Sequence, residues 1–419
     1  MGAVMLVVAM LSMLDSQDPL SDEAVRQRID RYRKENAVVQ VVDRSGTPVK
    51  EATVRVVQTR QAFLFGCNAF GLLSHQDKQR EALYQKRFSD LFNYATLGFY
   101  WGAYEPRQGE TIEARLREQA QWLKARGIVV KGHPLVWHEV YPGWAPKEPS
   151  QAQPLLKKRV EDIVGQFKGL IDAWDVINEA TVSAKFDNGV GNWVKRDGVA
   201  SVVGSTLDWG HRANPKAFLL YNDFNVSRDF LDLASELVKR KAPVHALGIQ
   251  SHMHGGDWKL ERVWQICEEY AQFGKPLHWT EVTVLSGEHG WMRAQPWPTT
   301  PEGEARQAEY VPKLYALLFS HPAVEAITWW DLMDGAWQGA PAGLIRADYS
   351  PKPAYERLLR KIRTEWMTRE TAVTGADGSL RFRGFLGDYA VIVESGGKRV
   401  EKAFKLSRGG KQTWMVRLD

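Results

Sequence analysis

From about residue 61 to residue 366, the chain repeats one pattern, in which a short apolar run is followed by a stretch with helical periodicity. Eight such runs occur, at residues 62–65, 95–101, 128–137, 171–179, 217–223, 246–252, 277–281 and 326–331. Alternating strands and helices favour parallel βαβ units, and eight units are the content of a closed barrel. We therefore predict an α/β fold with a (β/α)8 TIM barrel over residues 61–366.

Segments with β character flank the predicted barrel. Residues 38–42 and 52–57 alternate around a Gly/Pro turn, which predicts a β-hairpin within residues 21–60, after a short helix. Residues 367–419 contain further short β runs, and both segments resemble halves of small carboxypeptidase-regulatory or transthyretin-like sandwich modules. A lone hairpin is marginal in water. We therefore predict one β-sandwich built from the N-terminal hairpin and the C-terminal strands, with separate packing of the two pieces on the barrel as the alternative.

Charge and the N-terminal residues limit the partners and the location of the protein. The net charge of +5 is spread thinly, without the dense Lys/Arg block that marks nucleic-acid binding. The apolar run Ala3–Leu14 is too short to span a bilayer and resembles the core of a signal peptide within residues 1–20. We expect a secreted or periplasmic protein without a membrane span, and a monomer. Because no basic n-region or Ala-x-Ala site is visible, a shortened or misassigned start is the alternative.

Two cysteines, Cys67 and Cys267, are too few for a disulfide scaffold. Buried free thiols are the expectation, and a single bridge is the alternative. The 17 tryptophans are the unusual count, because the flat indole face suits stacking on sugar rings. Their clustering near the ends of the apolar runs favours a lined cleft over a purely structural role.

Two glutamates end two of the apolar runs and predict the chemistry. Glu179 follows Trp174-Asp-Val-Ile-Asn, and Glu281 follows Trp279-Thr. TIM barrels build their active sites at the C-terminal ends of strands, and glycoside hydrolysis needs two carboxyl groups that flank the scissile bond. The apolar neighbourhood of Glu179 favours a raised pKa and a role as general acid. Glu281 is the predicted nucleophile, with His252 as a hydrogen-bond donor to it.

Other polar residues at the strand ends are the candidate substrate contacts. The amide of Asn178 is placed to reach a sugar hydroxyl beside the scissile bond. His133 and His138 lie at one strand end without a third ligand at metal spacing, which favours hydroxyl contacts over a metal site. We expect neither a metal nor a cofactor. The remaining candidates are Trp137, Asn222, Gln250, His252, Trp330 and Trp337.

Six motifs occur in a characteristic order. They are Gly132-His-Pro-Leu-Val-Trp-His138, Trp174-Asp-Val-Ile-Asn-Glu179, Tyr221-Asn-Asp-Phe-Asn225, Gly248-Ile-Gln-Ser-His252, Trp279-Thr-Glu281 and Tyr349-Ser-Pro-Lys-Pro-Ala-Tyr355. Together they resemble glycoside hydrolase family 10, the retaining endo-β-1,4-xylanases, over roughly residues 62–362. The resemblance implies that Glu179 is the acid/base and Glu281 the nucleophile. It also implies that His133, Trp137, Asn178, Gln250 and His252 shape the sugar site, with Trp330 and Trp337 as its aromatic walls.

Departures from the family pattern concern the choice of substrate. The family usually carries Glu, Asn and Lys where this chain has Thr96-Leu-Gly-Phe-Tyr100, so the subsite two sugars from the cut is altered or lost. Val140 and Thr283 stand where Gln and Asp are usual, and residues 285–303 form a long loop that is placed to cover the cleft. We predict cleavage of xylan or a related β-glycan. The alternatives are a different or decorated glycan or short oligosaccharides, and a non-catalytic carbohydrate-binding barrel.

Overall fold

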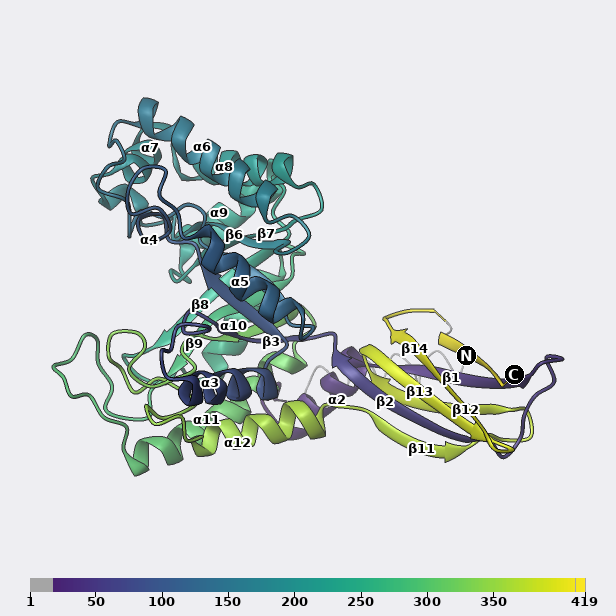
Figure 1. Ribbon diagram of the computed structural model, residues 1–419. Helices are drawn as coiled ribbons and strands as arrows, with labels where there is room; N and C mark the ends of the chain where they lie inside the picture. Colours follow the sequence, from purple (N-terminus) through teal and green to yellow (C-terminus); the bar gives the residue numbers. More distant parts are fainter. Residues whose placement is uncertain (1–17, 411, 419) are drawn as a thin grey trace, which may run out of the picture.

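The computed structural model describes residues 18–410 and 412–418. The apolar run Ala3–Leu14, on which the predicted signal peptide depends, lies outside the described residues. The described chain forms a barrel surrounded by helices and, beside it, a β-sandwich that contains strands from both ends of the sequence (Figure 1).

The barrel is closed by eight parallel strands, as predicted. They are β3 (Leu64–Asn68), β4 (Tyr94–Gly98), β5 (Val129–His133), β6 (Ala173–Asn178), β7 (Phe218–Asp223), β8 (Ala246–Met253), β9 (Leu277–Val284) and β10 (Val324–Trp329). β10 pairs with both β9 and β3, which closes the ring. Every residue of β6 and of β9 is buried. This continuous burial explains why these strands read as unbroken apolar runs rather than as alternating ones.

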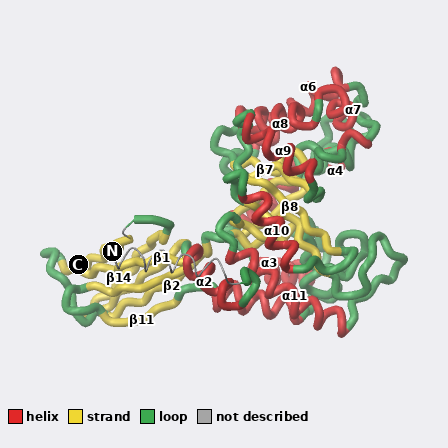
Figure 2. Tube along the Cα trace, turned by 180° about the vertical axis from the view of Figure 1, so that it is seen from behind, coloured by secondary structure: helices red, strands yellow, loops and turns green. Residues whose placement is uncertain are grey.

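Helices surround the barrel strands (Figure 2). The long ones are α3 (Lys78–Leu91), α5 (Glu113–Lys124), α6 (Pro149–Gln166), α8 (Val199–Ala213), α9 (Arg228–Lys239), α10 (Leu260–Ala271), α11 (Pro301–Ser320) and α12 (Pro353–Arg360), which a π-helical turn at Lys361–Glu365 extends. In α9 the buried residues recur at one-turn spacing, at Phe230, Leu233, Ala234 and Leu237. One apolar stripe of this kind is what a helix needs to pack against a sheet.

Shorter helices follow the C-terminal ends of two strands. α4 (Trp101–Tyr104) follows β4, and a 3-10 turn (Ser183–Lys185) with α7 (Gly189–Asp197) follows β6. The apolar runs predicted for the second and third strands therefore end earlier than expected. β4 stops at Gly98 and β5 stops at His133, which leaves Tyr100 and Trp137 in loops at the mouth of the barrel.

The sandwich consists of two sheets. β1 (Lys34–Asp43), β12 (Ser379–Phe385) and β15 (Gln412–Leu418) form one, and β2 (Thr53–Gln61), β11 (Arg369–Val373), β13 (Gly387–Ser395) and β14 (Lys398–Leu406) form the other. Residues from both ends of the chain, among them Val39, Val54, Val391 and Trp414, share one buried core. The predicted joint sandwich is confirmed, and separate packing of the two β pieces is wrong.

The predicted N-terminal hairpin is wrong, because β1 and β2 lie in different sheets. Both edges of β1 are occupied, by β12 and by β15, so β2 has no edge of β1 to pair with. The connection turns at Glu51, whose φ of 58° is in the left-handed region, and leads β2 to the opposite sheet. Alternation of apolar residues shows which side chains of a strand face inwards, but not which strand lies beside it.

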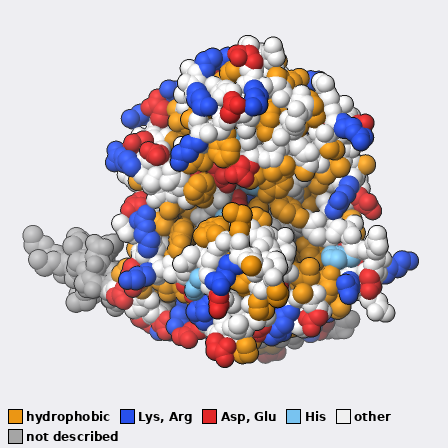
Figure 3. All heavy atoms as spheres, turned by 90° about the vertical axis from the view of Figure 1, so that its left-hand side faces the viewer, with side chains coloured by type: hydrophobic (Ala, Val, Ile, Leu, Met, Phe, Trp, Pro, Cys, Tyr) orange, Lys and Arg blue, Asp and Glu red, His pale blue; other side chains and the backbone are white. Residues whose placement is uncertain are grey.

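Helix α2 (Asp22–Arg33) joins the sandwich to the barrel. The buried guanidinium of Arg33 donates to the carbonyl oxygens of Phe319, His321 and Val324, at 2.5, 2.5 and 2.7 Å. β2 ends at Gln61 and β3 begins at Leu64, so the sandwich adjoins the N-terminal ends of the barrel strands. Their C-terminal ends open on the opposite side, where Figure 3 shows a hollowed face with acidic side chains at its centre.

Two further expectations concern the described residues. Cys67 and Cys267 are both buried and free, so the single bridge is excluded. Within residues 18–410 and 412–418, no helix combines the length and the apolar character that crossing a bilayer requires.

Candidate active site

Glu179 follows the last residue of β6 in an unusual backbone conformation. Its φ is 54°, and its N–H donates to the carbonyl of Asn222 at 2.8 Å. The side-chain atom Oε1 accepts from Asn178 Nδ2 and Gln250 Nε2, at 2.9 and 2.8 Å, and Oε2 accepts from Trp137 Nε1 at 3.0 Å. Left-handed backbone at a non-glycine residue is strained and occurs often at functional sites. Here it turns the carboxyl into the barrel mouth.

The protonation of Glu179 is set mainly by its burial. The side chain is 9% exposed. Burial raises the pKa of Glu179 to about 8 against the effect of the Gln250 hydrogen bond, and the negative charge of Glu281 adds to the rise. The carboxyl therefore holds its proton at neutral pH, as a general acid requires.

Glu281 lies within β9 and is held as a carboxylate. Its Oε2 accepts from His252 Nε2 at 2.8 Å, and its Oε1 accepts from Asn222 Nδ2 at 2.8 Å. Burial alone would raise the pKa of Glu281, but the His252 hydrogen bond and the charges of His133, His252 and Lys131 leave this pKa below its usual value. The two glutamates thus have opposite shifts, which is the pattern that assigns one as acid and the other as nucleophile.

Two buried amides connect the glutamates. Asn222 Nδ2 bonds both Glu281 Oε1 and Asn178 Oδ1 at 2.8 Å, and Asn178 in turn bonds Glu179. Thr280 Oγ1 donates to Asn222 Oδ1 at 2.5 Å. A Cβ atom on Gly248 would lie 2.5 Å from that same amide oxygen, so only glycine leaves room for it. Asn178 and Asn222 lie where the sequence places them, but their amides are bonded to protein groups.

His252 is fixed on both ring nitrogens. Nε2 donates to Glu281, and Nδ1 lies 2.9 Å from Thr283 Oγ1. The ring of Trp337 packs against His252 with centroids 4.3 Å apart. The family usually has an Asp at the position of Thr283. The Thr283 hydroxyl therefore contacts His252 in place of that Asp, without adding a negative charge.

A buried ion pair below the glutamates was missed by the sequence analysis. Lys131 Nζ and His133 Nδ1 both contact Asp175 Oδ2, at 2.5 and 2.8 Å, and all three side chains are buried. The other ring nitrogen of His133 lies 3.8 Å from Glu281 Oε1. The detectable signal was Lys131 in an otherwise apolar strand, two residues before His133 and therefore on the same strand face.

Aromatic rings line the side of the mouth formed by β3, β4 and β10. Phe70, Tyr100 and Trp330 form this aromatic wall. The Phe70 ring contacts Tyr100 and Trp330, with centroids 5.9 and 5.5 Å apart, and Tyr100 lies 5.5 Å from both His133 and Trp137. Tyr100 belongs to the segment Thr96-Leu-Gly-Phe-Tyr100, which stands where the family usually carries Glu, Asn and Lys. At this segment the wall offers an aromatic ring in place of charged and amide groups.

A further buried carboxyl, that of Asp331, directly follows Trp330 in the chain. Asp331 Oδ1 accepts from Asn68 Nδ2 at 3.4 Å. Burial raises the pKa of Asp331 to about 7, against the hydrogen bond from Asn68. The pairing of Asp331 with Asn68 was not predicted from the sequence, because an Asn and an Asp at strand ends carry no signal of their pairing.

The loop between β9 and α11 borders Trp337. The Trp291 ring stacks on His254 with centroids 4.5 Å apart and lies edge-on to Trp337 at 6.1 Å. Trp297 is buried and donates from Nε1 to the carbonyl of Glu288 at 2.9 Å. The loop thus forms an ordered rim of the mouth, with Trp291 half exposed at its edge.

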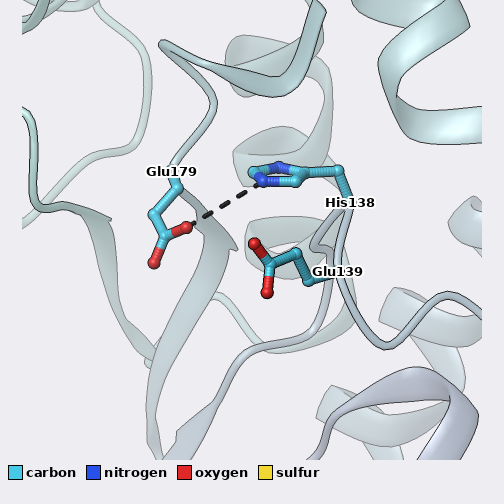
Figure 4. Close-up of side chains that lie close together, drawn as sticks. All are labelled: His138, Glu139 and Glu179. Atoms are coloured by element: carbon cyan, nitrogen blue, oxygen red, sulfur yellow. Dashed lines mark ion pairs between the residues drawn. The ribbon is translucent and has the colours of Figure 1, made fainter. Parts of the chain in front are cut away.

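His138 is a predicted sugar contact that lies beside two carboxyl groups. His138 follows Trp137 in the loop after β5, and its ring lies beside Glu139 and Glu179 (Figure 4). These three side chains are the ones that could hold a metal ion among the described residues.

Several known proteins are similar to this chain in sequence. The chain is 31% identical to endo-1,4-beta-xylanase B of Paenibacillus barcinonensis over 245 residues, which are 55% of this chain and 73% of that protein. It is 27% identical to the anti-sigma-I factor RsgI6 of Acetivibrio thermocellus over 397 residues, 92% of this chain but only 48% of that protein. The chain therefore spans about half the length of this relative.

Solved structures are similar over the barrel. Xylanase 10B from Thermotoga petrophila, solved in complex with xylobiose, has a TM-score of 0.61 and 25% identity over 72% of this chain and 94% of that one. The family model described as Glycosyl hydrolase family 10 matches residues 58–361. The resemblance seen in the six motifs is confirmed, and the chain belongs to glycosyl hydrolase family 10.

Proposed function

We propose that this protein is a retaining glycoside hydrolase that cleaves β-1,4-xylosidic bonds in xylan or a related β-glycan. One observation carries the proposal: two buried carboxyls at the barrel mouth have opposite pKa shifts, upward to about 8 for Glu179 and downward for Glu281. The similar proteins whose printed names give an activity on a glycan are endo-1,4-beta-xylanases, which favours xylan as the substrate.

The match to a family of retaining glycosidases supports a double displacement. The protonated Glu179 gives its proton to the glycosidic oxygen while the Glu281 carboxylate attacks the anomeric carbon. The glycosidic C–O bond breaks, a glycosyl ester forms on Glu281, and the shortened glycan leaves as an alcohol. Glu179, now ionised, takes a proton from water. The resulting hydroxide attacks the anomeric carbon, releases Glu281 and returns both carboxyls to their starting states.

The surrounding residues hold the two carboxyls in these roles. Trp137 and Gln250 fix the orientation of Glu179, and His252 and Asn222 keep Glu281 ionised and aimed. His133 lies near Glu281 and beside Trp330, where both side chains can contact the sugar at the cut. Trp337, packed on His252, forms the opposite wall.

A second candidate function is the same reaction on a decorated glycan or on short oligosaccharides. The aromatic wall favours this candidate, because its Tyr100 belongs to the segment Thr96–Tyr100, where the family usually offers charged and amide groups. A non-catalytic binding barrel is the third candidate. The similarity to an anti-sigma factor over 92% of the chain favours it, and the intact pair of glutamates argues against it.

Product analysis separates these candidates. The protein would be incubated with xylan, decorated xylan, mixed-linkage β-glucan and aryl β-xylosides, and the products identified by chromatography and NMR. Internal cleavage of xylan with retained β-configuration at the new reducing ends is the expected result. Turnover of aryl or short substrates alone would replace the endo-xylanase assignment with the second candidate. Binding to xylan without any turnover would establish the third.

We also propose that the protein is a secreted or periplasmic monomer. The apolar run Ala3–Leu14 supports export. Expression with the native N-terminus, fractionation of the host cells and N-terminal sequencing of the product would test it, and an uncleaved cytosolic product would contradict it. Light scattering during size-exclusion chromatography would show a monomer near or slightly below 47.6 kDa.

The domain boundaries are a further proposal. We assign residues 21–60 and 367–419 to the sandwich and residues 61–366 to the catalytic barrel. The paired strands from both chain ends and their shared core support this division. Limited proteolysis of the full chain should cut first near residues 61 and 366. Initial cuts inside the barrel would contradict the boundaries.

A further inference from the structure

Three side chains of metal-ligating type meet at the catalytic acid. His138 and Glu139 come from the loop after β5, and Glu179 comes from the end of β6 (Figure 4). One ligand atom from each lies within 4.8 Å of the other two. In the sequence, the spacing of His133 and His138 showed no third ligand. The fold supplies ligands from a different strand and from the neighbouring position.

The surroundings of His138 suit a metal ion at its Nε2. Such an ion needs the tautomer that carries its proton on Nδ1 and its lone pair on Nε2. Ser183 Oγ provides an acceptor for that proton, because it lies 2.8 Å from His138 Nδ1 and its own hydrogen has the carbonyl oxygen of Glu179 as an acceptor at 3.2 Å. Phe186 packs on the ring, with centroids 3.9 Å apart, and holds it in this orientation.

The Nε2 lone pair faces Glu179 without a partner. His138 is 2% exposed, and its Nε2 has no hydrogen-bond partner within the described part of the chain. It lies 3.9 Å from Glu179 Oε2. Burial lowers the pKa of His138 to about 4, so the ring is neutral at neutral pH and the contact is not an ion pair. A buried acceptor aimed at a carboxyl oxygen is a place where a cation gains two ligands.

We propose that His138 Nε2, Glu139 and Glu179 bind a divalent transition-metal ion of the zinc type, and that this binding inhibits the enzyme. Imidazole and carboxylate are zinc ligands at about 2.0–2.2 Å, and three protein ligands leave a fourth position for water. Ligand atoms around such an ion lie roughly 3.4 Å apart. Glu139 is exposed and free to turn inwards to reach this spacing. Magnesium and calcium, which prefer all-oxygen sites, fit poorly.

Inhibition follows from the proton that the metal displaces. Coordination requires the ionised carboxylate, so zinc binding releases the proton of Glu179 to solvent. The metal-bound carboxylate then has no proton to give to the glycosidic oxygen. This consequence rests on the proposed function of Glu179, whereas the metal site itself does not.

A zinc titration of hydrolysis tests the inhibition. Initial rates on an aryl β-xyloside and on xylan would be measured with zinc chloride in a non-coordinating buffer, and EDTA would be added at the end. Wild-type protein should be inhibited and fully recover. Glu139→Gln should keep its zinc-free rate and need at least tenfold more zinc for half-inhibition. Glu261→Gln, which removes an equal charge from an exposed position in the first turn of α10, should behave as wild type.

Direct binding separates a failure of the site from a failure of the proposed function. Isothermal titration with zinc would be carried out on wild type, His138→Ala, Glu139→Gln and Glu261→Gln, with magnesium as the second probe. Affinity for one equivalent of zinc should fall at least tenfold in the first two variants only. Equal affinities in all four proteins would overturn the site, whether or not the protein hydrolyses glycans. Zinc bound at full occupancy without inhibition would overturn the inhibitory role.

Discussion

The catalytic centre and the aromatic wall face the same barrel mouth but are built differently. In the centre, amides and an imidazole donate to both glutamates, at 2.8 to 2.9 Å for Asn222, His252, Gln250 and Asn178. In the wall, Phe70, Tyr100 and Trp330 contact one another through rings 5.5 to 5.9 Å apart. Hydrogen bonds tolerate little displacement, whereas ring contacts adapt to different partners. On the proposed function, we infer that the centre fixes the reaction and that the wall selects the glycan.

Glu281→Ala tests the centre most directly. Without the nucleophile no glycosyl ester forms, so kcat on xylan and on aryl xylosides should fall at least roughly 10⁴-fold. A small anion such as azide, which fits the vacated space, should restore turnover of an activated aryl xyloside with inversion of configuration. Steady-state rates and NMR of the product check both results. Unchanged thermal unfolding would show an intact fold, and substantial residual turnover with retention would contradict the assignment.

Glu179→Gln should separate substrates by their leaving groups. The amide cannot protonate the departing oxygen, so xylan cleavage should fall by roughly 10²–10⁴-fold. An aryl xyloside with an acidic phenol leaves without that proton, so formation of the glycosyl ester should be affected far less. Rapid-quench measurement of the first phenol release gives this rate. Equal losses on both substrates would contradict the acid role.

The pH profile follows from the same assignment. The reactive form has Glu281 ionised and Glu179 protonated. Since the pKa of Glu179 is about 8 and that of Glu281 is below its usual value, kcat/KM should be flat near neutral pH. It should decline as the pH rises above about 8, because Glu179 then loses its proton. If kcat/KM instead began to decline near pH 5 as the pH rises, burial would not control the pKa of Glu179.

Tyr100→Ala tests the wall rather than the chemistry. Loss of a ring that contacts His133 and Trp137 should raise KM for oligosaccharides by roughly tenfold, about 1.4 kcal/mol, with a smaller change in kcat. Tyr100→Phe is the matched control, because it keeps the ring and removes only the hydroxyl. It should behave nearly as wild type. If KM rises equally in both variants, the hydroxyl rather than the ring contacts the substrate. The contrast between the centre and the wall would then weaken.

The sequence predicted the features that local patterns determine. Eight buried strands read as eight apolar runs, and Glu179 directly follows one of these strands. Glu281 was expected at the end of another, but β9 continues to Val284, so Glu281 lies within it. Local patterns did not predict which strands pair with each other. The alternation in β1 and β2 showed their inward faces correctly, but both edges of β1 pair with strands more than 300 residues away, and the expected hairpin does not form. The Lys131–Asp175 pair was missed for a related reason, since a contact between two strands leaves no mark in either one.

The smallest effect is expected at Thr283, which contacts His252 of the catalytic centre and stands where the family usually has Asp. Its hydroxyl lies 2.9 Å from His252 Nδ1, and the opposite nitrogen holds Glu281. Thr283→Val keeps the shape and removes one hydrogen bond, worth about 1 kcal/mol. We expect kcat/KM on xylan to fall by roughly fivefold with unchanged product configuration. A loss above 100-fold would show that the hydroxyl controls His252 as strongly as a carboxylate would, and that the centre depends on this chain's own substitution.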